Sequence, residues 1–325
     1  MVDIAPSSLK VTVIATVLNE EASITQLIDS LAAQTRPPDE VIIVDGGSVD
    51  ATVERIRAAA ADRLNLELLQ LPGCNIAEGR NAAIARATGD VIAVTDAGVR
   101  LKPSWLEQLL LPFEKRRGRV DVVSGFFEPD PRSTFEIAMG ATVLPTREEI
   151  NPARFLPSSR SVAFTKDAWR RAGGYPEWLD YCEDVVFDMA LRRSGCVFGW
   201  APEAVALFRP RPGLRAFWRQ YYRYARGDGK ARLWPERHAI RYASYLAGLR
   251  LLLAARRNRS LLLPLAIGAL LHLWAPYRRL ASRLDGLPLP EKLQAVAWVP
   301  VIRLAGDLAK MAGYPVGVLW RVRQR

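Results

Sequence analysis

Four short apolar runs alternate with helix-like segments over roughly the first 130 residues, and this alternation constrains the fold more than any other feature. The runs are rich in Val and Ile, as strands buried on both faces of a sheet are, and they cover residues 11–17, 41–45, 66–71 and 91–96. The segments between them read SITQLIDSLAAQ, DATVERIRAAAADR and AEGRNAAIARATG. Strands that alternate with helices predict a doubly wound, mostly parallel α/β sheet.

Polar residues follow the ends of all four predicted strands. Asn19 and Glu20 follow the first strand, Asp45 ends the second, residues 75–80 (NIAEGR) lie beyond the third, and Asp96 ends the fourth. One such residue would usually belong to a turn or a helix cap. However, ligands of open α/β sheets bind beyond the carboxyl ends of the strands. Together, the four sites predict a cleft that contains carboxylates, a Gly-rich turn and one Arg.

Two adjacent acids, Glu183 and Asp184, begin a predicted helix within the less regular region 120–232. The helix dipole favours acids in the first turn, and this effect alone would account for both. The later stretch, residues 208–231, is dense in Arg and aromatic side chains. It is interpreted either as a binding segment or as an amphipathic helix that lies on a membrane with its arginines extended toward water.

The composition changes after about residue 235, and we therefore divide the chain into residues 1–232, which contain the sheet, and a helical region, residues 233–325. Residues 242–255 and 261–276 are strongly apolar, with RRNR between them and YRR after the second. A spanning helix needs about 20 apolar residues, and these runs are near or below that length. A pair of core helices is one interpretation. We favour membrane-embedded or interfacial helices, because Arg clusters beside apolar stretches fit an anionic cytoplasmic leaflet.

The net charge of +11 indicates an anionic partner. The basic residues cluster in the middle and C-terminal parts beside apolar runs, and no nucleic-acid-binding motif is present, so a membrane or a diphosphate is favoured over nucleic acid. The start, MVDIAPSSLKVTV, has an acid and no basic region before an apolar stretch, unlike a signal peptide. We therefore expect the chain at the cytoplasmic face of the cell membrane.

Five separated stretches agree in order and spacing with those of one enzyme family. They are LNEEASITQLIDSLAAQ, IVDGGSVDAT, GRNAAIARATGDVIAVTDAG, CED and RQYYRYARG, and they span about residues 10–230. In these stretches the chain resembles family 2 glycosyltransferases of the GT-A fold. The resemblance implies an inverting enzyme that moves a sugar from a nucleotide-diphosphate sugar, with a UDP-sugar favoured, to an acceptor hydroxyl. A lipid-linked or glycan acceptor in cell-envelope or surface glycan synthesis is expected.

The same resemblance implies roles for the residues at the strand ends. The acid of the second motif holds the nucleotide base in the family, which gives this role to Asp45. Asn19 and Glu20 match positions that line the nucleotide pocket, and Arg80 matches an Arg near the base or diphosphate. Asp96 matches the first acid of the family's DxD motif, which contacts ribose or metal.

The catalytic and acceptor segments are matched in the same way. Glu183 and Asp184 match the family's ED pair, so Asp184 is the expected general base, which removes the hydroxyl proton as the oxygen attacks C1. Gln220, Arg223 and Tyr224 match a Gln-x-x-Arg-aromatic segment that binds acceptor or diphosphate.

The sequence departs from the family pattern at the metal site. Gly98 stands where the DxD motif has its second acid, and the two histidines, His238 and His272, lie in or beside the C-terminal part. A cation such as Mg²⁺ can be held by one or two carboxylates together with substrate phosphates, so a Mg²⁺ or Mn²⁺ ion bound by Asp96 stays in question.

Arg209 and Arg211 offer an alternative source of positive charge for the leaving diphosphate, because guanidinium groups match phosphate geometry.

Two other functions are considered for the chain. A nucleotidyltransferase would show a Gly-rich loop with Lys or Arg after the first strand, where this chain has VLNEEAS. A non-catalytic or regulatory membrane partner that retains the GT-A fold is the other alternative, although the presence of all three predicted aspartates argues against it.

Overall fold

The computed structural model describes residues 9–115 and 120–324. The chain forms two compact units, each described here by itself: unit 1 comprises Met1–Glu128 and Arg147–Phe208, and unit 2 comprises Pro129–Thr146 and Arg209–Arg325. The division after Phe208 differs from the predicted boundary at residue 232, and a segment from the middle of the chain joins the C-terminal unit.

The sheet belongs to unit 1. The strands are β1 (Val11–Val17), β2 (Glu40–Asp45), β3 (Leu66–Gln70), β4 (Val91–Val94), β5 (Val99–Leu101), β6 (Val122–Pro129), β7 (Val162–Thr165) and β8 (Phe198–Phe208). The helices of this unit are α1 (Ile24–Ala32), α2 (Thr52–Ala60), α3 (Ile76–Arg86), α4 (Trp105–Lys115), α6 (Lys166–Ala172) and α7 (Glu183–Arg193), with a short 3₁₀ turn, η1 (Arg147–Glu149).

Across the described residues, the strands form one eight-stranded sheet in the order β3-β2-β1-β4-β7-β6-β8-β5. β1 pairs in parallel with β2 and β4, and β2 pairs in parallel with β3. β7 pairs antiparallel with β4 and β6, and β5 pairs antiparallel with β8. The expected α/β class is confirmed, and the sheet is mixed: the four strands that the apolar runs predicted pair in parallel, whereas β7 and β5 pair antiparallel with their neighbours.

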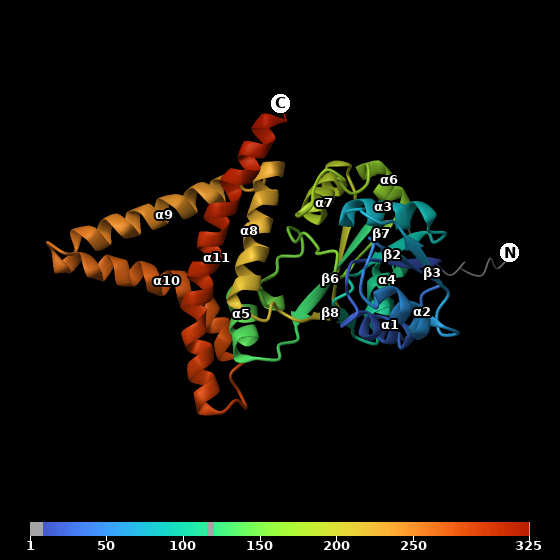
Figure 1. Cartoon of the computed structure of the whole chain (residues 1–325), viewed down its shortest axis with the longest axis horizontal. Coiled ribbons are helices and arrows are strands. Elements are labelled where there is room, and N and C mark those ends of the chain that lie inside the picture. Colours follow the sequence, from blue (N-terminus) through green and yellow to red (C-terminus); the bar gives the residue numbers. More distant parts are fainter. Residues whose placement is uncertain (1–8, 116–119, 325) are drawn as a thin grey trace. The chain divides into compact units, whose positions relative to one another are not determined.

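Helices cover both faces of the sheet (Figure 1). On β1, Val11, Val13 and Ala15 pack with residues of α1, α2 and α4, whereas Ile14 packs with residues of α3, α6 and α7. Side chains of a strand alternate between its two faces, so β1 contributes to both cores. This double coverage explains why the predicted strands are apolar throughout and show little alternation.

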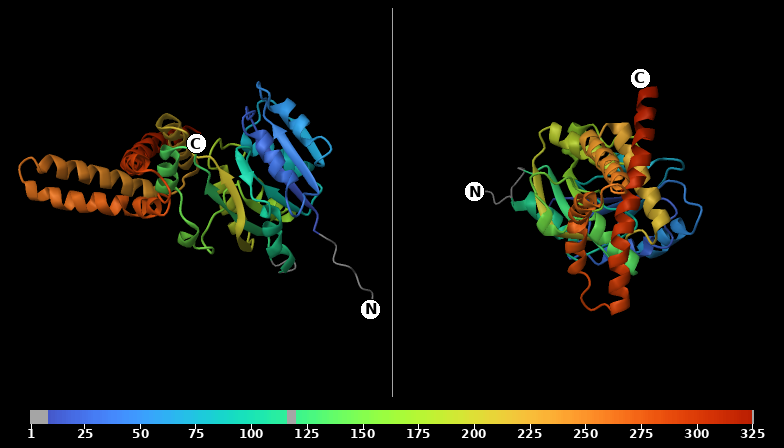
Figure 2. Two further views of the ribbon diagram at one scale, coloured as in Figure 1. Left: turned by 90° about the horizontal axis from the view of Figure 1, so that it is seen from below. Right: turned by 90° about the vertical axis from the view of Figure 1, so that its left-hand side faces the viewer.

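Unit 2 is helical in the part that the structure describes. Its elements are α5 (Thr134–Val143), α8 (Leu214–Ala231), α9 (Pro235–Ala254), the 3₁₀ turn η2 (Arg259–Leu261), α10 (Leu262–Ala281) and α11 (Leu289–Arg323). α9 and α10 form a hairpin that extends from α11 (Figures 1 and 2). The predicted helical region is therefore present, but it also includes α5 and α8.

Glycines explain why α8 belongs with the C-terminal helices. A Cβ atom added to Gly317 of α11 would lie 2.0 Å from the carbonyl oxygen of Arg226 on α8, and one added to Gly313 would lie 2.2 Å from that of Tyr222. Only glycine permits such a close approach of two helix backbones. The composition of α8 is polar, which is why a boundary drawn from composition separated it from its packing partner.

Candidate active site

The loop after β2 is organised by Asp45, whose side chain is buried. Its carboxylate accepts hydrogen bonds from the backbone N–H groups of Gly47, at 3.1 Å, and Ser48, at 3.1 and 3.2 Å, and from the Ser48 hydroxyl. Gly47 has a φ of 100°, a conformation that favours glycine. Asp45 therefore holds the DGGS turn in shape. Its predicted contact with a nucleotide base stays a prediction.

Asn19 and Glu20, in the loop after β1, are bound to the neighbouring loop after β2. The Asn19 N–H donates to the Ser48 hydroxyl at 2.8 Å, and the Val49 N–H donates to Asn19 Oδ1 at 2.9 Å. The Glu20 N–H donates to the Thr52 hydroxyl at 2.8 Å. Asn19 and Asp45 thus meet through Ser48, as expected for residues that follow adjacent parallel strands.

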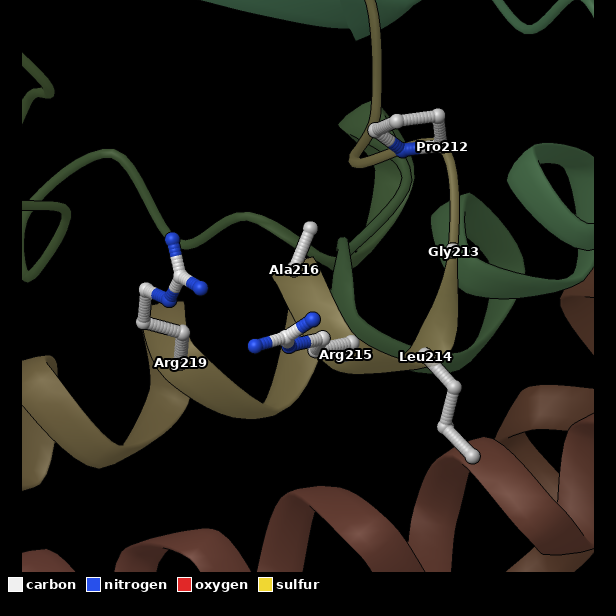
Figure 3. Close-up of a pocket in the computed structure, with 6 residues that line it drawn as sticks. All are labelled: Pro212, Gly213, Leu214, Arg215, Ala216 and Arg219. Atoms are coloured by element: carbon white, nitrogen blue, oxygen red, sulfur yellow. The ribbon is translucent and has the colours of Figure 1, made fainter.

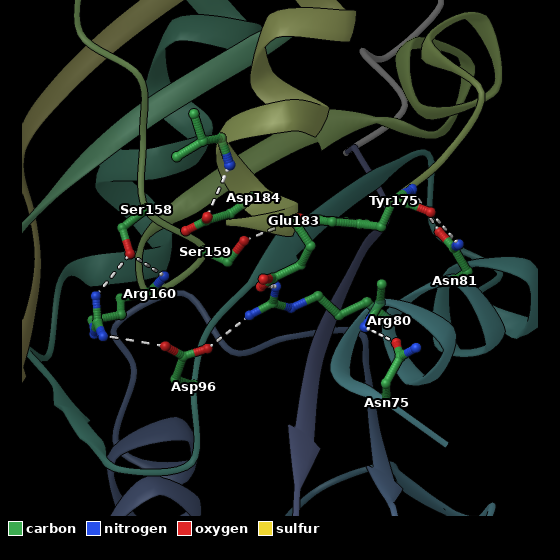
Figure 4. Close-up of polar contacts among 12 residues, drawn as sticks. Asn75, Arg80, Asn81, Asp96, Ser158, Ser159, Arg160, Tyr175, Glu183 and Asp184 are labelled. Atoms are coloured by element: carbon green, nitrogen blue, oxygen red, sulfur yellow. Dashed lines mark hydrogen bonds and ion pairs between the residues drawn. The ribbon is translucent and has the colours of Figure 1, made fainter. Parts of the chain in front are cut away.

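Arg80 connects two other predicted residues. α3 begins with a capping box, in which Asn75 Oδ1 accepts from the N–H groups of the first turn and Glu78 accepts from the Asn75 N–H. This start places Arg80 one turn later, where its side chain is 2% exposed. One guanidinium nitrogen donates to Glu183 Oε1 at 2.7 Å and another to Asp96 Oδ1 at 3.0 Å (Figure 4). Arg80 therefore joins the end of β4 to the start of α7.

The charges of this cluster affect one another. Burial lowers the pKa of Arg80, but the carboxylates of Glu183 and Asp96 outweigh burial and raise that pKa above its ordinary value. Burial raises the pKa of Glu183 to about 7, and the neighbouring Asp184 carboxylate acts in the same direction, against the effect of Arg80. Arg80 therefore remains charged, and the pKa of its buried partner Glu183 is raised.

Asp184 is the more accessible member of the acidic pair. α7 begins after Cys182, whose φ of 66° is left-handed, and both acids lie in the first turn. The Glu183 side chain is buried against Arg80, whereas Asp184 is partly exposed, and its Oδ1 accepts from the Val185 N–H at 2.8 Å. This difference fits a structural role for Glu183 and leaves Asp184 accessible to a substrate.

Arg160 was not predicted from the sequence, yet it lies in the same cluster. Its Nε is 3.6 Å from Asp96 Oδ2, and its NH1 donates to the Ser158 hydroxyl at 3.0 Å (Figure 4). The only sequence signal is an Arg shortly before the apolar stretch SVAF. This signal indicates a position near Asp96 only when the antiparallel pairing of β7 with β4 is known.

The residues around Asp96 do not fit a divalent cation. One Asp96 oxygen accepts from Arg80 and the other lies 3.6 Å from Arg160 Nε, so both oxygens already face guanidinium groups rather than a second carboxylate. Gly98 contributes no ligand atom from its side chain. Nowhere in residues 9–115 and 120–324 do three or more His, Cys, Asp or Glu side chains form a group that could hold a metal ion.

The predicted acceptor residues lie in unit 2, where several of them contact one another. Arg211 Nε donates to Gln220 Oε1 at 3.3 Å, and Gln220 donates to the Tyr224 hydroxyl at 2.7 Å. Arg223 lies on the same face of α8 and is exposed. Arg209, in contrast, donates two hydrogen bonds to the buried Glu136, at 2.7 and 2.9 Å. Its guanidinium is therefore engaged in holding α5.

A cavity of about 400 Å³ lies at the start of α8. Figure 3 shows the arginines Arg215 and Arg219 beside it, together with Pro212, Gly213, Leu214 and Ala216. None of the predicted site residues lines this cavity. It adds a basic depression to unit 2, but it is distinct from the cluster around Arg80.

Comparison with known protein families gives two matches. The family described as glycosyl transferase family 2 matches residues 12–170, and the family described as glycosyl transferase family group 2 matches residues 139–305. Among characterised relatives, the chain is 26% identical to the glycosyltransferase AglE of Haloferax volcanii, over 69% of this chain and 74% of that protein. It is 25% identical to the succinoglycan biosynthesis protein ExoA of Rhizobium meliloti, over 66% of this chain and 67% of that protein.

A solved structure has the same fold. The mannosyltransferase PcManGT from Pyrobaculum calidifontis, determined in complex with GDP-Man and Mn²⁺, superposes with a TM-score of 0.56 at 20% identity, over 98% of this chain and 88% of that protein. The fold is therefore GT-A, as the resemblance implied. The second family match and the similarity to AglE and ExoA lead to one conclusion: this chain is a glycosyltransferase that belongs to glycosyl transferase family group 2.

Proposed function

We propose that this enzyme transfers a sugar from a nucleoside-diphosphate sugar to an acceptor hydroxyl, with inversion at the anomeric carbon and Asp184 as the general base. The observation that carries the proposal is the connection from Asp96 through Arg80 to Glu183. It ties the loop expected to hold the donor to the first turn of α7. A partly exposed carboxylate, Asp184, follows directly in that turn.

The proposed step is a direct displacement. The acceptor oxygen attacks C1 of the sugar from the face opposite the diphosphate, and its proton passes to the Asp184 carboxylate. The bond between C1 and the diphosphate oxygen breaks, and its electron pair stays with the leaving group. Arg80 and Glu183 act on this step by holding the first turn of α7 in place. The donor is bound by the loops after β1, β2 and β4.

The relatives support the donor and acceptor classes. PcManGT was solved with a GDP-sugar, which supports a nucleoside-diphosphate sugar as donor and leaves UDP- and GDP-sugars as the first to test. ExoA acts in succinoglycan biosynthesis, which supports a glycan or lipid-linked acceptor in surface polysaccharide synthesis. On unit 2, we assign acceptor binding to Gln220, Arg223 and Tyr224, because they share one face of α8.

A membrane location is the second part of the proposal. Among the described helices, one segment, Arg259–Ala281, is long and apolar enough to cross a membrane. Leu263, Leu270, Leu271 and Trp274 of α10 are between 67% and 74% exposed, although soluble proteins seldom expose large apolar patches. Residues 237–284 contain nine arginines and no acid. We therefore propose that the α9–α10 hairpin inserts into, or lies on, an anionic membrane surface at its cytoplasmic face.

A screen of donors by thermal shift tests the proposed function. Because a ligand that binds the folded state raises the melting temperature with concentration, one class among UDP-, GDP- and dTDP-sugars should stabilise the full chain. Asp96→Asn should reduce this stabilisation, whereas Asp167→Asn, a change at an exposed acid on α6, should not. If no nucleotide sugar shifts the melting temperature or binds in calorimetry, the proposed function is wrong.

A further inference from the structure

The pairing of β4 with β7 brings Arg160 next to Asp96. The two strands are antiparallel, with Val94 opposite Val162, so the residues just before β7 lie beside those just after β4. The Thr95 hydroxyl donates to the Arg160 carbonyl oxygen at 3.1 Å and fixes the two segments together. Arg160 is thus held at the carboxyl end of the parallel strands, where α/β sheets bind their ligands.

The Arg160 side chain is supported from several sides. Its guanidinium carbon lies 4.9 Å from the ring centre of Phe208 and 5.7 Å from that of Phe127. The Ser158 hydroxyl accepts from NH1 at 3.0 Å, and Asp96 Oδ2 lies 3.6 Å from Nε. The side chain nevertheless remains 23% exposed, compared with 2% for Arg80. Arg160 therefore presents a positioned charge that a ligand can reach.

The space around Gly98 does not exclude a side chain at this position, where the DxD motif has its second acid. A Cβ atom built at this position meets no other atom within 4 Å among the described residues. The space for a Cβ atom is open there, yet the chain carries glycine, and Arg80 and Arg160 face the Asp96 carboxylate. The charge next to Asp96 is therefore supplied by a side chain of this protein.

We propose that Arg160 binds the diphosphate of the donor and supplies the positive charge that a divalent cation supplies in other enzymes of this fold. This inference rests on the proposed function. When the bond from C1 to the diphosphate oxygen breaks and the electron pair moves to that oxygen, the guanidinium stabilises the added negative charge. Its planar fork of N–H groups matches phosphate oxygens. The acceptor proton still goes to Asp184, so the step balances without a bound metal ion.

Calorimetric titration of the full chain with UDP and with GDP tests this proposal, in excess EDTA and in Mn²⁺. We expect the dissociation constant of the preferred nucleotide to differ by less than about threefold between the two conditions. A loss of affinity of tenfold or more in EDTA would overturn the role of Arg160 and leave the proposed function intact. Absence of nucleotide binding in both conditions would overturn the proposed function itself.

Variants separate a contact with the diphosphate from a structural role. Arg160→Ala should weaken nucleotide binding in EDTA by about tenfold or more, whereas the control Arg171→Ala, at an arginine that pairs with Asp121 and Asp167, should leave binding unchanged. Arg160→Gln serves as the second variant, and circular dichroism establishes that each variant is folded. Wild-type affinity in both Arg160 variants would overturn the proposal.

The reverse experiment uses Gly98. The double variant Gly98→Asp with Arg160→Ala places a second carboxylate near Asp96 and removes the competing guanidinium. It should bind Mn²⁺ in the presence of the nucleotide, seen as a loss of the free Mn²⁺ signal in electron paramagnetic resonance, and its nucleotide affinity should rise about tenfold or more with Mn²⁺. Wild type should show neither effect. If wild type responds to Mn²⁺ as the double variant does, the proposal is wrong.

Discussion

Arg80 carries a positive charge in a position that is 2% exposed, and two carboxylates balance it. An isolated buried charge would cost far more than a small domain can offset, so the ion pairs with Glu183 and Asp96 are a condition for its presence. The same three side chains fix the end of β4 relative to the start of α7. At Arg80, the stability of the fold and the geometry of the candidate active site depend on the same contacts.

Replacement of Arg80 should therefore be costly. Arg80→Gln leaves two carboxylates without their shared cation and should lower the free energy of unfolding by about 3–5 kcal/mol, as removal of one partner of a buried ion pair does. Arg86→Gln, on the same helix, removes an exposed arginine paired with Glu67 and should cost less than about 1 kcal/mol. Urea denaturation followed by circular dichroism measures both. Equal destabilisation by the two variants would show that the Arg80 network is not structural.

The sequence predicted part of this site for a physical reason. Residues that follow adjacent parallel strands converge at one sheet edge, so Asn19 and Asp45, which share Ser48 as a partner, could be grouped from the order of apolar runs. Arg160 could not, because strand direction and partner are set by contacts distant in sequence. The inward orientation of the Asp45 carboxylate, toward its own turn, is also a property of the folded loop that the DGGS motif does not reveal.

At the level of elements, the strands buried on both faces were the most predictable. β1, β2 and β4 coincide with runs of Val and Ile, because a strand covered by helices on both sides needs apolar residues at every position. β5, a strand of three residues, and β8, with polar and exposed positions, show no such run. β7 is apolar, but the antiparallel direction of its pairing with β4 and β6 depends on contacts distant in sequence, which the apolar runs do not reveal.

The α9–α10 hairpin differs from the strands, since many of its apolar side chains are exposed, among them four on α10: Leu263, Leu270, Leu271 and Trp274. Replacing Leu263, Leu270, Leu271 and Trp274 together by Ser removes side chains that are more than 60% exposed, so the fold should be kept. Binding to vesicles of phosphatidylcholine and phosphatidylglycerol should fall by about tenfold or more, because each apolar side chain contributes on the order of 1 kcal/mol when it enters a bilayer.

Sedimentation with these vesicles measures that change. Val197→Ser, at an exposed apolar residue of unit 1, is the matched control and should bind as wild type does. Binding of wild type should also weaken in vesicles of phosphatidylcholine alone, because the arginines of residues 237–284 lose their anionic partners. A quadruple variant that binds like wild type would rule out the hairpin as the membrane contact.

At the level of the whole molecule, the two units contain different groups of candidate residues. Unit 1 holds the cluster of Arg80, Asp96, Arg160 and the acidic pair, and unit 2 holds the candidate acceptor residues and the exposed hairpin. The composition shift near residue 235 marks the start of the apolar helices, but the unit begins earlier because α8 packs along α11 at glycine contacts. Amino-acid composition indicates which helices are exposed to solvent or lipid. The boundary between two packed units depends instead on which pairs of helices and strands contact each other.

The rate of sugar transfer by the Asp184→Asn variant, compared with that of wild type, tests the proposed mechanism most directly. Labelled donor, of the class found by thermal shift, is incubated with wild type or variant and with washed membranes as the source of acceptor. Donor affinity is measured in parallel by calorimetry, and Asp167→Asn serves as the control acid.

Asp184→Asn should lower the transfer rate by at least about 100-fold, because the amide cannot accept the hydroxyl proton. Its donor affinity should stay within about threefold of wild type, since Asp184 acts on the acceptor. Asp167→Asn should transfer normally. Transfer by Asp184→Asn at the wild-type rate would contradict its assignment as the general base and the proposed inverting mechanism with it.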